Sequence, residues 1–203
     1  GKTDALDAVR AARSVLAQER PATPRSNGER EALRALMAAR EGAAAAKRAG
    51  LCQLRALLVT APEPARAELR SLTRARLLAC LTAMRPERRT DPELRGSSLA
   101  LRSVARRVQQ LTAEERELAR EIKTLTQKLA PQLLDQPGVG PLLAAQLVLS
   151  WSHKGRLTSE AAFARLAGVA PIPASSGQTI RYRLDRSGDR QLNRALHMII
   201  VTR

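Results

Sequence analysis

Residues 94–129 carry the most regular pattern in the sequence, a heptad repeat of apolar side chains. Its members are Leu94, Leu101, Val104, Val108, Leu111, Leu118, Ile122, Leu125 and Leu129. Glu115 interrupts the rhythm with a charged side chain. Over about four heptads, such a repeat is typical of a coiled coil. The alternative is one amphipathic helix packed within its own chain. The repeat favours pairing with another helix, but the preceding Leu-rich helices and a second copy of the chain are both possible partners.

The remaining sequence also favours helices. Aromatic residues number three in 203, namely Trp151, Phe163 and Tyr182. This composition excludes a β-sandwich or a β-barrel, whose strands draw on aromatic and β-branched residues. Apolar spacing and breaker residues predict helices over 1–20, 29–60 and 65–84, a linker from Pro21 to Gly28, and a compact unit from Pro131 onward. The expected fold is mainly α.

The charge points to a polyanionic partner. The chain has 35 Lys and Arg against 19 Asp and Glu, a formal net charge of +16. Nucleic acid is the first candidate for such an excess. A membrane partner is not expected, because no apolar run approaches the roughly 20 residues of a membrane span and no signal peptide opens the chain. Cys52 and Cys80 are expected to be buried free thiols in a reducing cytosol, because neither has the neighbours of a zinc site.

The segment 134–149 contains a Pro-Gly-Val-Gly-Pro turn before an Ala/Leu-rich helix. Gly138 and Gly140 let the backbone approach a phosphate closely, and the amides that open the following helix can hold that phosphate. The pattern is that of a helix-hairpin-helix, which binds a nucleic-acid backbone without reading its sequence. An ordinary tight turn is the alternative. The strong positive charge favours the nucleic-acid interpretation.

In the segment 168–197, a Pro-rich stretch is followed by two serines and a glycine. Four arginines come next: Arg181, Arg183, Arg186 and Arg190. A serine hydroxyl beside guanidinium groups offers what phosphoryl transfer needs, a nucleophile and stabilisation of the charged phosphate. Arg190 and Arg194 are expected to bind nucleic acid. No His-Asp pair lies nearby and the GxSxG motif of hydrolases is absent. From the residues alone, a polar turn on a basic surface is the better interpretation.

The first residues, Lys-Thr-Asp-Ala-Leu-Asp, place Asp4 and Asp7 on one face of a helix. Two such carboxylates suit Mg²⁺ by type. The alternative is an N-capping residue followed by an acidic first turn, which complements the helix dipole. Without further context the capping interpretation is the better one.

Taken in order, these segments resemble the transposase family of insertion sequence one-ten, related to the Piv and MooV invertases. The resemblance runs through KTDALDA, the long helices, QPGVG and FARLAGVAPIPASSGQ to SGDRQLNRALH. It implies a bacterial, cytoplasmic DNA transposase of the DEDD serine-recombinase type that is guided by a bridge RNA. The resemblance implies donor DNA, target DNA and the guide RNA as partners. It also implies a homo-oligomer, in which a dimer assembles to a tetramer through the coiled coil.

The resemblance also implies roles for individual residues. Ser176, directly before the glycine, corresponds to the nucleophile that forms a covalent phosphoserine, with Arg181, Arg183 and Arg186 stabilising the phosphate. Asp4 and Asp7 correspond to the last two of four carboxylates that bind Mg²⁺, and the other two lie outside this chain. The chain is therefore expected to be a fragment that lacks most of the RuvC-like domain and the C-terminal end, with little strand-exchange activity of its own.

The implied organisation has three parts. Residues 1–20 are the end of a RuvC-like domain, residues 21–130 a helical linker and coiled coil, and residues 131–203 an α-helical transposase domain with the helix-hairpin-helix and a serine-bearing loop. Two functions from other classes stay open: a non-catalytic, helical nucleic-acid-binding module, and a helical dimerisation protein whose charge serves solubility.

Overall fold

The computed structural model describes residues 3–17, 27–153 and 155–203. It confirms a mainly α fold. The elements, in chain order, are α1 (Asp4–Leu16), α2 (Glu29–Thr60), α3 (Glu63–Leu69), α4 (Arg74–Ala83), the 3₁₀ turn η1 (Pro86–Arg88), α5 (Pro92–Leu129), α6 (Pro131–Leu134), α7 (Pro141–Trp151), α8 (Glu160–Leu166), β1 (Ile172–Pro173), β2 (Tyr182–Arg183) and α9 (Arg190–Val201). Most of the predicted linker from Pro21 to Gly28 lies outside the described residues, as do the first two residues of the chain.

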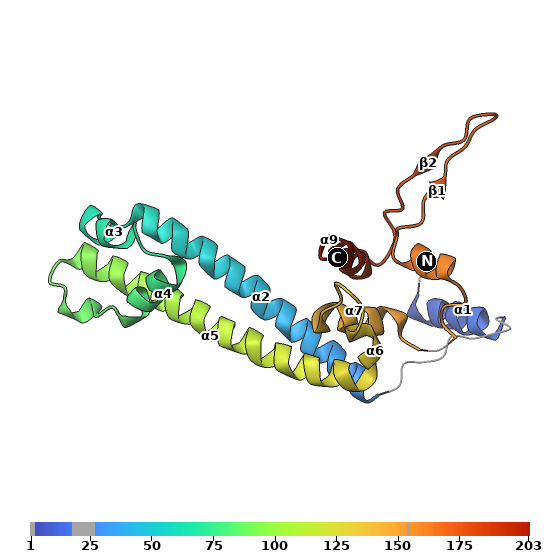
Figure 1. Ribbon diagram of the computed structural model, residues 1–203, viewed down its shortest axis with the longest axis horizontal. Coiled ribbons are helices and arrows are strands. Elements are labelled where there is room, and N and C mark those ends of the chain that lie inside the picture. Colours follow the sequence, from blue (N-terminus) through green and yellow to red (C-terminus); the bar gives the residue numbers. More distant parts are fainter. Residues whose placement is uncertain (1–2, 18–26, 154) are drawn as a thin grey trace.

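Helices α2 and α5 form a long antiparallel hairpin that dominates the molecule (Figure 1). Helix α2 ends where Pro62 follows, since proline cannot continue the backbone hydrogen bonds of a helix. Helix α5 begins at Pro92, with the Asp91 carboxylate accepting a hydrogen bond from the Leu94 amide at 2.7 Å. It ends just before Pro131. Helices α3 and α4 lie at one end of this hairpin, and α6, α7 and α9 at the other (Figure 1).

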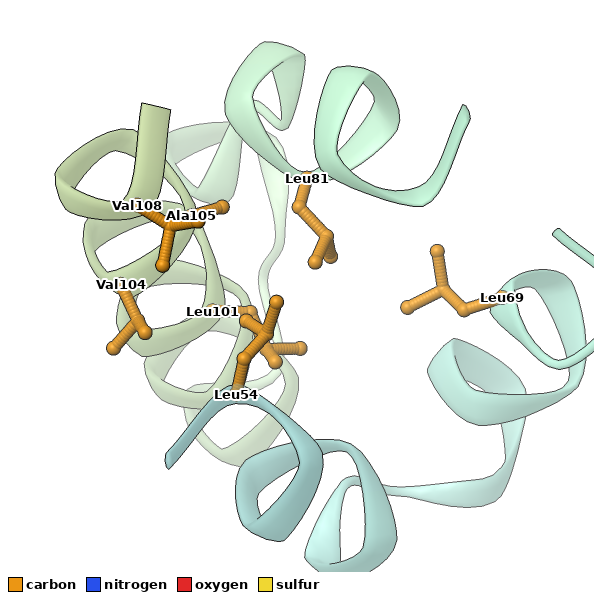
Figure 2. Packing of buried hydrophobic residues seen from close by; sticks show 7 residues of the cluster. All are labelled: Leu54, Leu69, Leu81, Leu101, Val104, Ala105 and Val108. Carbon is orange, nitrogen blue, oxygen red and sulfur yellow. The ribbon is translucent and has the colours of Figure 1, made fainter. Parts of the chain in front are cut away.

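The heptad repeat of α5 is covered by α2 of the same chain. At the end near α3 and α4, buried residues of four helices form a distal cluster: Leu54, Leu69, Leu81, Leu101, Val104, Ala105 and Val108 (Figure 2). At the other end, α2, α5 and α7 share a second cluster: Leu33, Ile122, Ala145, Val148 and Leu149. Each fully buried aliphatic side chain contributes about 1.5–3 kcal/mol. The sequence left open whether this helix pairs with a preceding helix of its own chain or with a second copy. In the structure it pairs with α2 of the same chain.

Glu115, the polar interruption of the repeat, lies between the two apolar clusters and joins α5 to α2. Its carboxylate accepts a hydrogen bond from Arg40 at 2.9 Å and a second from the Lys47 ammonium. The side chain is 15% exposed, so these partners replace most of its water. The hydrogen bond from Lys47 lowers the pKa of the Glu115 carboxyl, against the effect of burial.

We expect Glu115→Gln to lower the free energy of unfolding at neutral pH by about 1–3 kcal/mol, because two cations lose their shared anion. The folded-state pKa of Glu115 lies below its ordinary value of 4.5. Its contribution is therefore complete above that value and is lost as the pH falls through the folded-state pKa. Urea titrations from neutral to acid pH should show the free energies of unfolding of the parent protein and of Glu115→Gln converging. Glu114→Gln, at the exposed neighbouring position, is the matched control. A constant difference across the range would contradict the role of the ion pair.

The single helix predicted over residues 65–84 is wrong. The structure divides this segment into α3 and α4 with a turn between them, so that Leu69 and Leu81 both reach the distal cluster (Figure 2). Tertiary packing overrides local propensity here. The expectation that the two cysteines are buried is also wrong, since Cys52 and Cys80 are both free and exposed. Leu-rich neighbours in sequence do not decide which face of a helix a residue occupies.

In the described part of the chain, no helix combines the length and apolar character needed to cross a bilayer.

Candidate functional site

Ser176 lies at the tip of a β hairpin that projects away from the helical body (Figure 1). The sequence predicted a loop here, and the structure has two short antiparallel strands, β1 and β2. A backbone bridge between Ser176 and Thr179 closes the tip, with N–O distances of 3.3 and 3.2 Å. Gly177, the first residue of the two-residue turn, has a φ of 60°. Hairpins whose first turn residue needs a positive φ favour glycine at that position.

We call this projecting hairpin, residues 168–188, the arm. The strand register assigns Ser176 to one of its two faces. Ile172 pairs with Arg183 and Pro173 with Tyr182, and the bridge between Ser176 and Thr179 continues the same register to the tip. Side chains alternate between the faces of a strand, and directly paired residues share a face. Ser176 therefore shares a face with Arg181 and Arg183. Ile180, Tyr182 and Leu184, each more than 60% exposed, belong to the opposite face.

The two adjacent serines differ in their hydrogen bonds. The Ser175 hydroxyl is tied to the backbone of Arg181, accepting from its amide at 3.3 Å and donating to its carbonyl oxygen at 3.5 Å. Within the described residues the Ser176 hydroxyl has no hydrogen-bond partner, and the residue is exposed. Of the two serines, Ser176 is thus the one whose hydroxyl makes no hydrogen bond within the described residues, and it shares its face with Arg181 and Arg183.

The arm joins the body through a narrow neck made by two glycines. A Cβ atom on Gly188 would lie 2.4 Å from the Gly168 nitrogen, so a side chain at this position has no room. Gly168 has a φ of 67°, which also favours glycine. Next to the neck, the Asp189 amide donates to the Leu166 carbonyl at 2.7 Å. The two strands of the arm therefore leave from adjoining points at the end of α8 and the start of α9.

Asp189 fixes the neck to the body. Its carboxylate caps α9 by accepting from the Gln191 and Leu192 amides, and it accepts a hydrogen bond from the Ser150 hydroxyl of α7 at 2.8 Å. Asn193 adds a bond from α9 to the Ala167 carbonyl at 3.0 Å. The orientation of the arm is thus set by α7, α8 and α9 together.

The other predicted arginines lie outside the strands. Arg186 is exposed in the return to α9, next to Asp185, whose pKa is lowered by hydrogen bonds from the side chain and backbone of Ser187. Arg190 and Arg194 are exposed on α9. Arg181 and Arg183 are therefore the two arginines of the segment that the register brings to the serine face.

Sequence reasoning missed a cavity of about 1210 Å³ between α2, α7 and α9. Its lining includes the side chains Arg34, Arg40, Arg48, Arg156 and Arg194 together with Glu41, Glu115 and Asp189. Asp189, which caps α9 beside the neck, is one of the lining residues. Its residues are dispersed in the sequence, and no local pattern identifies them.

The glycine turn before α7 packs against α9, whereas a loop that binds a phosphate would be open to it. Gly138 has a φ of 79°, and a Cβ atom there would lie 2.7 Å from the Ile199 carbonyl oxygen of α9. Thr202 also donates to the Gly138 carbonyl at 3.2 Å. The space around Gly140, the N-cap of α7, is open. Gly138 thus serves helix packing, and phosphate binding at Gly138 and Gly140 stays a prediction.

Asp4 and Asp7 lie in the first turn of α1, and both are exposed. Thr3 caps this helix, accepting from the Leu6 amide at 3.4 Å, and Asp7 lies 4.0 Å from Arg10. The two carboxylates suit Mg²⁺ by donor type, and the four-carboxylate set that the resemblance implies stays a prediction. Over the described ranges, no group of three or more His, Cys, Asp or Glu residues could hold a metal ion. No hydrogen bond or ion pair of the described residues connects α1 to the arm.

Residues 130–203 match the model of a family described as Transposase IS116/IS110/IS902 family. The matched range contains the glycine turn, the neck and the whole arm with Ser176. No curated protein matches the chain.

Proposed function

We propose, from the match of residues 130–203 to the model of the Transposase IS116/IS110/IS902 family, that the protein cuts and rejoins DNA during the transposition of an insertion sequence, with Ser176 as its nucleophile. One observation carries the assignment to Ser176. Within the family-matched range, its hydroxyl is exposed, free of hydrogen bonds to other described residues, and on the same face of the arm as Arg181 and Arg183.

The proposed reaction is a phosphoryl transfer. Ser176 Oγ attacks a scissile phosphorus, the Oγ–P bond forms, and the bond to the leaving nucleoside oxygen breaks. The serine proton passes to solvent, and the leaving oxygen gains a proton. Because the phosphodiester is conserved as a phosphoserine ester, the hydroxyl of a second DNA end can displace the serine without another energy source.

Arg181 and Arg183 stabilise the transition state of this step. Their guanidinium groups can donate paired hydrogen bonds to the phosphate oxygens, whose negative charge grows as the fifth oxygen approaches. Arg186, on the return to α9, contributes a further positive charge near the arm. Arg190 and Arg194, with the amides around Gly138 and Gly140, hold the DNA backbone beside the site.

Asp4 and Asp7 are the proposed ligands of Mg²⁺, together with two carboxylates from outside residues 1–203. Their exposed oxygens at one helix start fit such a hard cation in donor type. When bound, Mg²⁺ supplies Lewis-acid polarisation of a phosphate oxygen.

The proposal includes a guide RNA, donor and target DNA, and assembly of protomers into a dimer and then a tetramer. Because α2 covers the heptad seam of α5, contacts between protomers use other surfaces of the helical hairpin. This is a specific departure from the assembly that the sequence suggested.

A covalent-trapping experiment tests the assignment. The full-length protein is incubated with Mg²⁺ and a nicked DNA substrate whose cleaved segment diffuses away, so that the protein–DNA ester accumulates. Trypsin cleaves after Arg165 and Arg181 and releases one peptide that contains both Ser175 and Ser176. Fragmentation of this peptide by mass spectrometry should locate the adduct on Ser176. An adduct on another residue contradicts the assignment, and binding without any adduct supports the non-catalytic module instead.

DNA binding by this chain should weaken steeply with salt. If about six phosphates are neutralised, the logarithm of the binding constant falls with the logarithm of the salt concentration with a slope near −5. Fluorescence anisotropy of a labelled duplex over a series of salt concentrations measures this slope. A slope near zero would indicate that the positive charge of the chain serves solubility rather than binding.

A further inference from the structure

The positive charge of the protein is concentrated at both ends of the helical hairpin. Residues 63–107, which form the end opposite the arm, contain eleven arginines and no lysine against five acidic residues. Residues 131–203 contain nine basic and four acidic residues. Between them, residues 111–129 of α5 balance four basic residues against four acidic ones. The two basic regions are at opposite ends of the molecule (Figure 1).

Most acidic groups at the distal end are already engaged. Glu63 pairs with Arg66 and Arg70, and Glu87 pairs with Arg102 at 3.2 Å. Asp91 caps α5. Eight arginines of this end make no ion pair with an acidic residue in the part of the chain that the structure describes: Arg74, Arg76, Arg85, Arg88, Arg89, Arg95, Arg106 and Arg107. All but Arg89 are exposed.

From this distribution we propose that the distal end, formed by α3, α4, η1 and the start of α5, is a second site for the phosphodiester backbone of nucleic acid. The inference extends the proposed function, because it takes nucleic acid as the ligand. Exposed arginine forks match phosphate oxygens in pairs, which a lysine ammonium does not. Such a cluster without acidic partners repels itself unless anions bind to it or water solvates it.

The hairpin fixes the separation of the two sites. Helix α2 has 32 residues, and at 1.5 Å per residue it is about 48 Å long. This length corresponds to about 14 base pairs of duplex. A duplex shorter than this occupies one end at a time, whereas a longer one reaches from the arm to the distal end.

Binding stoichiometry and salt dependence test the proposal with duplex DNA and, in parallel, duplex RNA. A duplex of about 8 base pairs should bind twice per chain, and one of about 30 base pairs once, bridging the two ends. The variant Arg85→Gln/Arg88→Gln/Arg95→Gln should bind the short duplex once. Its salt slope on the long duplex should be shallower by about 2–3 units, since three phosphate contacts are lost. The matched control Arg116→Gln/Arg120→Gln/Lys123→Gln makes the same charge change on exposed positions in the middle of α5 and should retain both short duplexes.

The exposed cysteines allow the distal site to be located directly. Cys80 lies on α4, and Cys52→Ser leaves it as the sole thiol of the chain. A photo-crosslinker on Cys80 should capture the nucleic acid, and the distal triple variant should reduce capture about tenfold. The nucleic acid that is captured more efficiently, DNA or RNA, is the distal ligand.

The outcomes separate this proposal from the proposed function. One short duplex per chain, with no capture at Cys80, overturns the distal site and leaves DNA binding at the arm intact. Absence of binding to any duplex overturns both. Equal displacement of nucleic acid from Cys80 by an acidic peptide would assign the distal end to a protein partner and overturn its assignment to nucleic acid.

Discussion

Strand exchange by the full-length protein is expected to disappear in Ser176→Ala, while its affinity for DNA stays within about twofold, because the change removes no charge and no phosphate contact of a cation. Loss of a covalent nucleophile should lower the rate by at least about a thousandfold. A gel assay of recombined DNA measures the rate, and anisotropy measures binding under the same conditions.

Ser175→Ala is the matched control for this change. It removes an equal hydroxyl from the adjacent residue, on the opposite face of the arm, where the oxygen is bound to the Arg181 backbone. We expect it to weaken exchange modestly by loosening the tip. An inactive Ser175→Ala together with an active Ser176→Ala would reverse the assignment of the nucleophile.

Closing the neck of the arm with a methyl group should have the largest effect on stability. In Gly188→Ala the new Cβ would lie 2.4 Å from the Gly168 nitrogen and 2.5 Å from the Gly168 Cα. Both are backbone atoms, so no side-chain rotation can relieve the clash. We expect a loss of about 3 kcal/mol. For a chain of this size that lowers the melting temperature by about 6–12 °C. Strand exchange should fail as well, although Ser176 is unchanged.

Differential scanning calorimetry measures the stability change, and limited trypsin digestion at Arg181 and Arg183 reports release of the arm. Gly42→Ala provides the control, since Gly42 lies inside α2 with no heavy atom within 4 Å of its added Cβ. That substitution should be neutral or stabilising by up to about 1 kcal/mol. Equal melting temperatures for Gly188→Ala and the parent would mean that the two strands do not meet at the neck.

The long helices could be predicted from the sequence because their signals are local. Helix α2 occupies residues 29–60, as its Ala/Leu-rich composition and the following prolines indicate, and α5 follows its heptad repeat. The turn between α3 and α4 could not be predicted in this way. It is formed because Leu69 and Leu81 pack into one cluster from two directions, which is a property of the assembled fold.

One strand of the arm has a local signal in the sequence. Residues 180–184 read Ile-Arg-Tyr-Arg-Leu, an alternation with a period of two that is typical of a strand. With strands of two residues and prolines around β1, this pattern is short and easily taken for a loop. In the sequence, only the family resemblance distinguishes Ser176 from Ser175. The strand register and the hydrogen bonds of Ser175 supply an independent physical argument.

The neck limits how far the Ser176 hydroxyl can extend from the body. Between Gly168 and Gly188 the arm is almost entirely exposed, so residues can be inserted there without repacking the body. Adding one residue to each strand would advance the tip by about 3.3 Å but turn the serine to the opposite face. Two residues on each strand would advance it by about 7 Å and restore the face. The distance of the hydroxyl from the body can therefore change only in steps of two residues per strand if the hydroxyl is to keep its face.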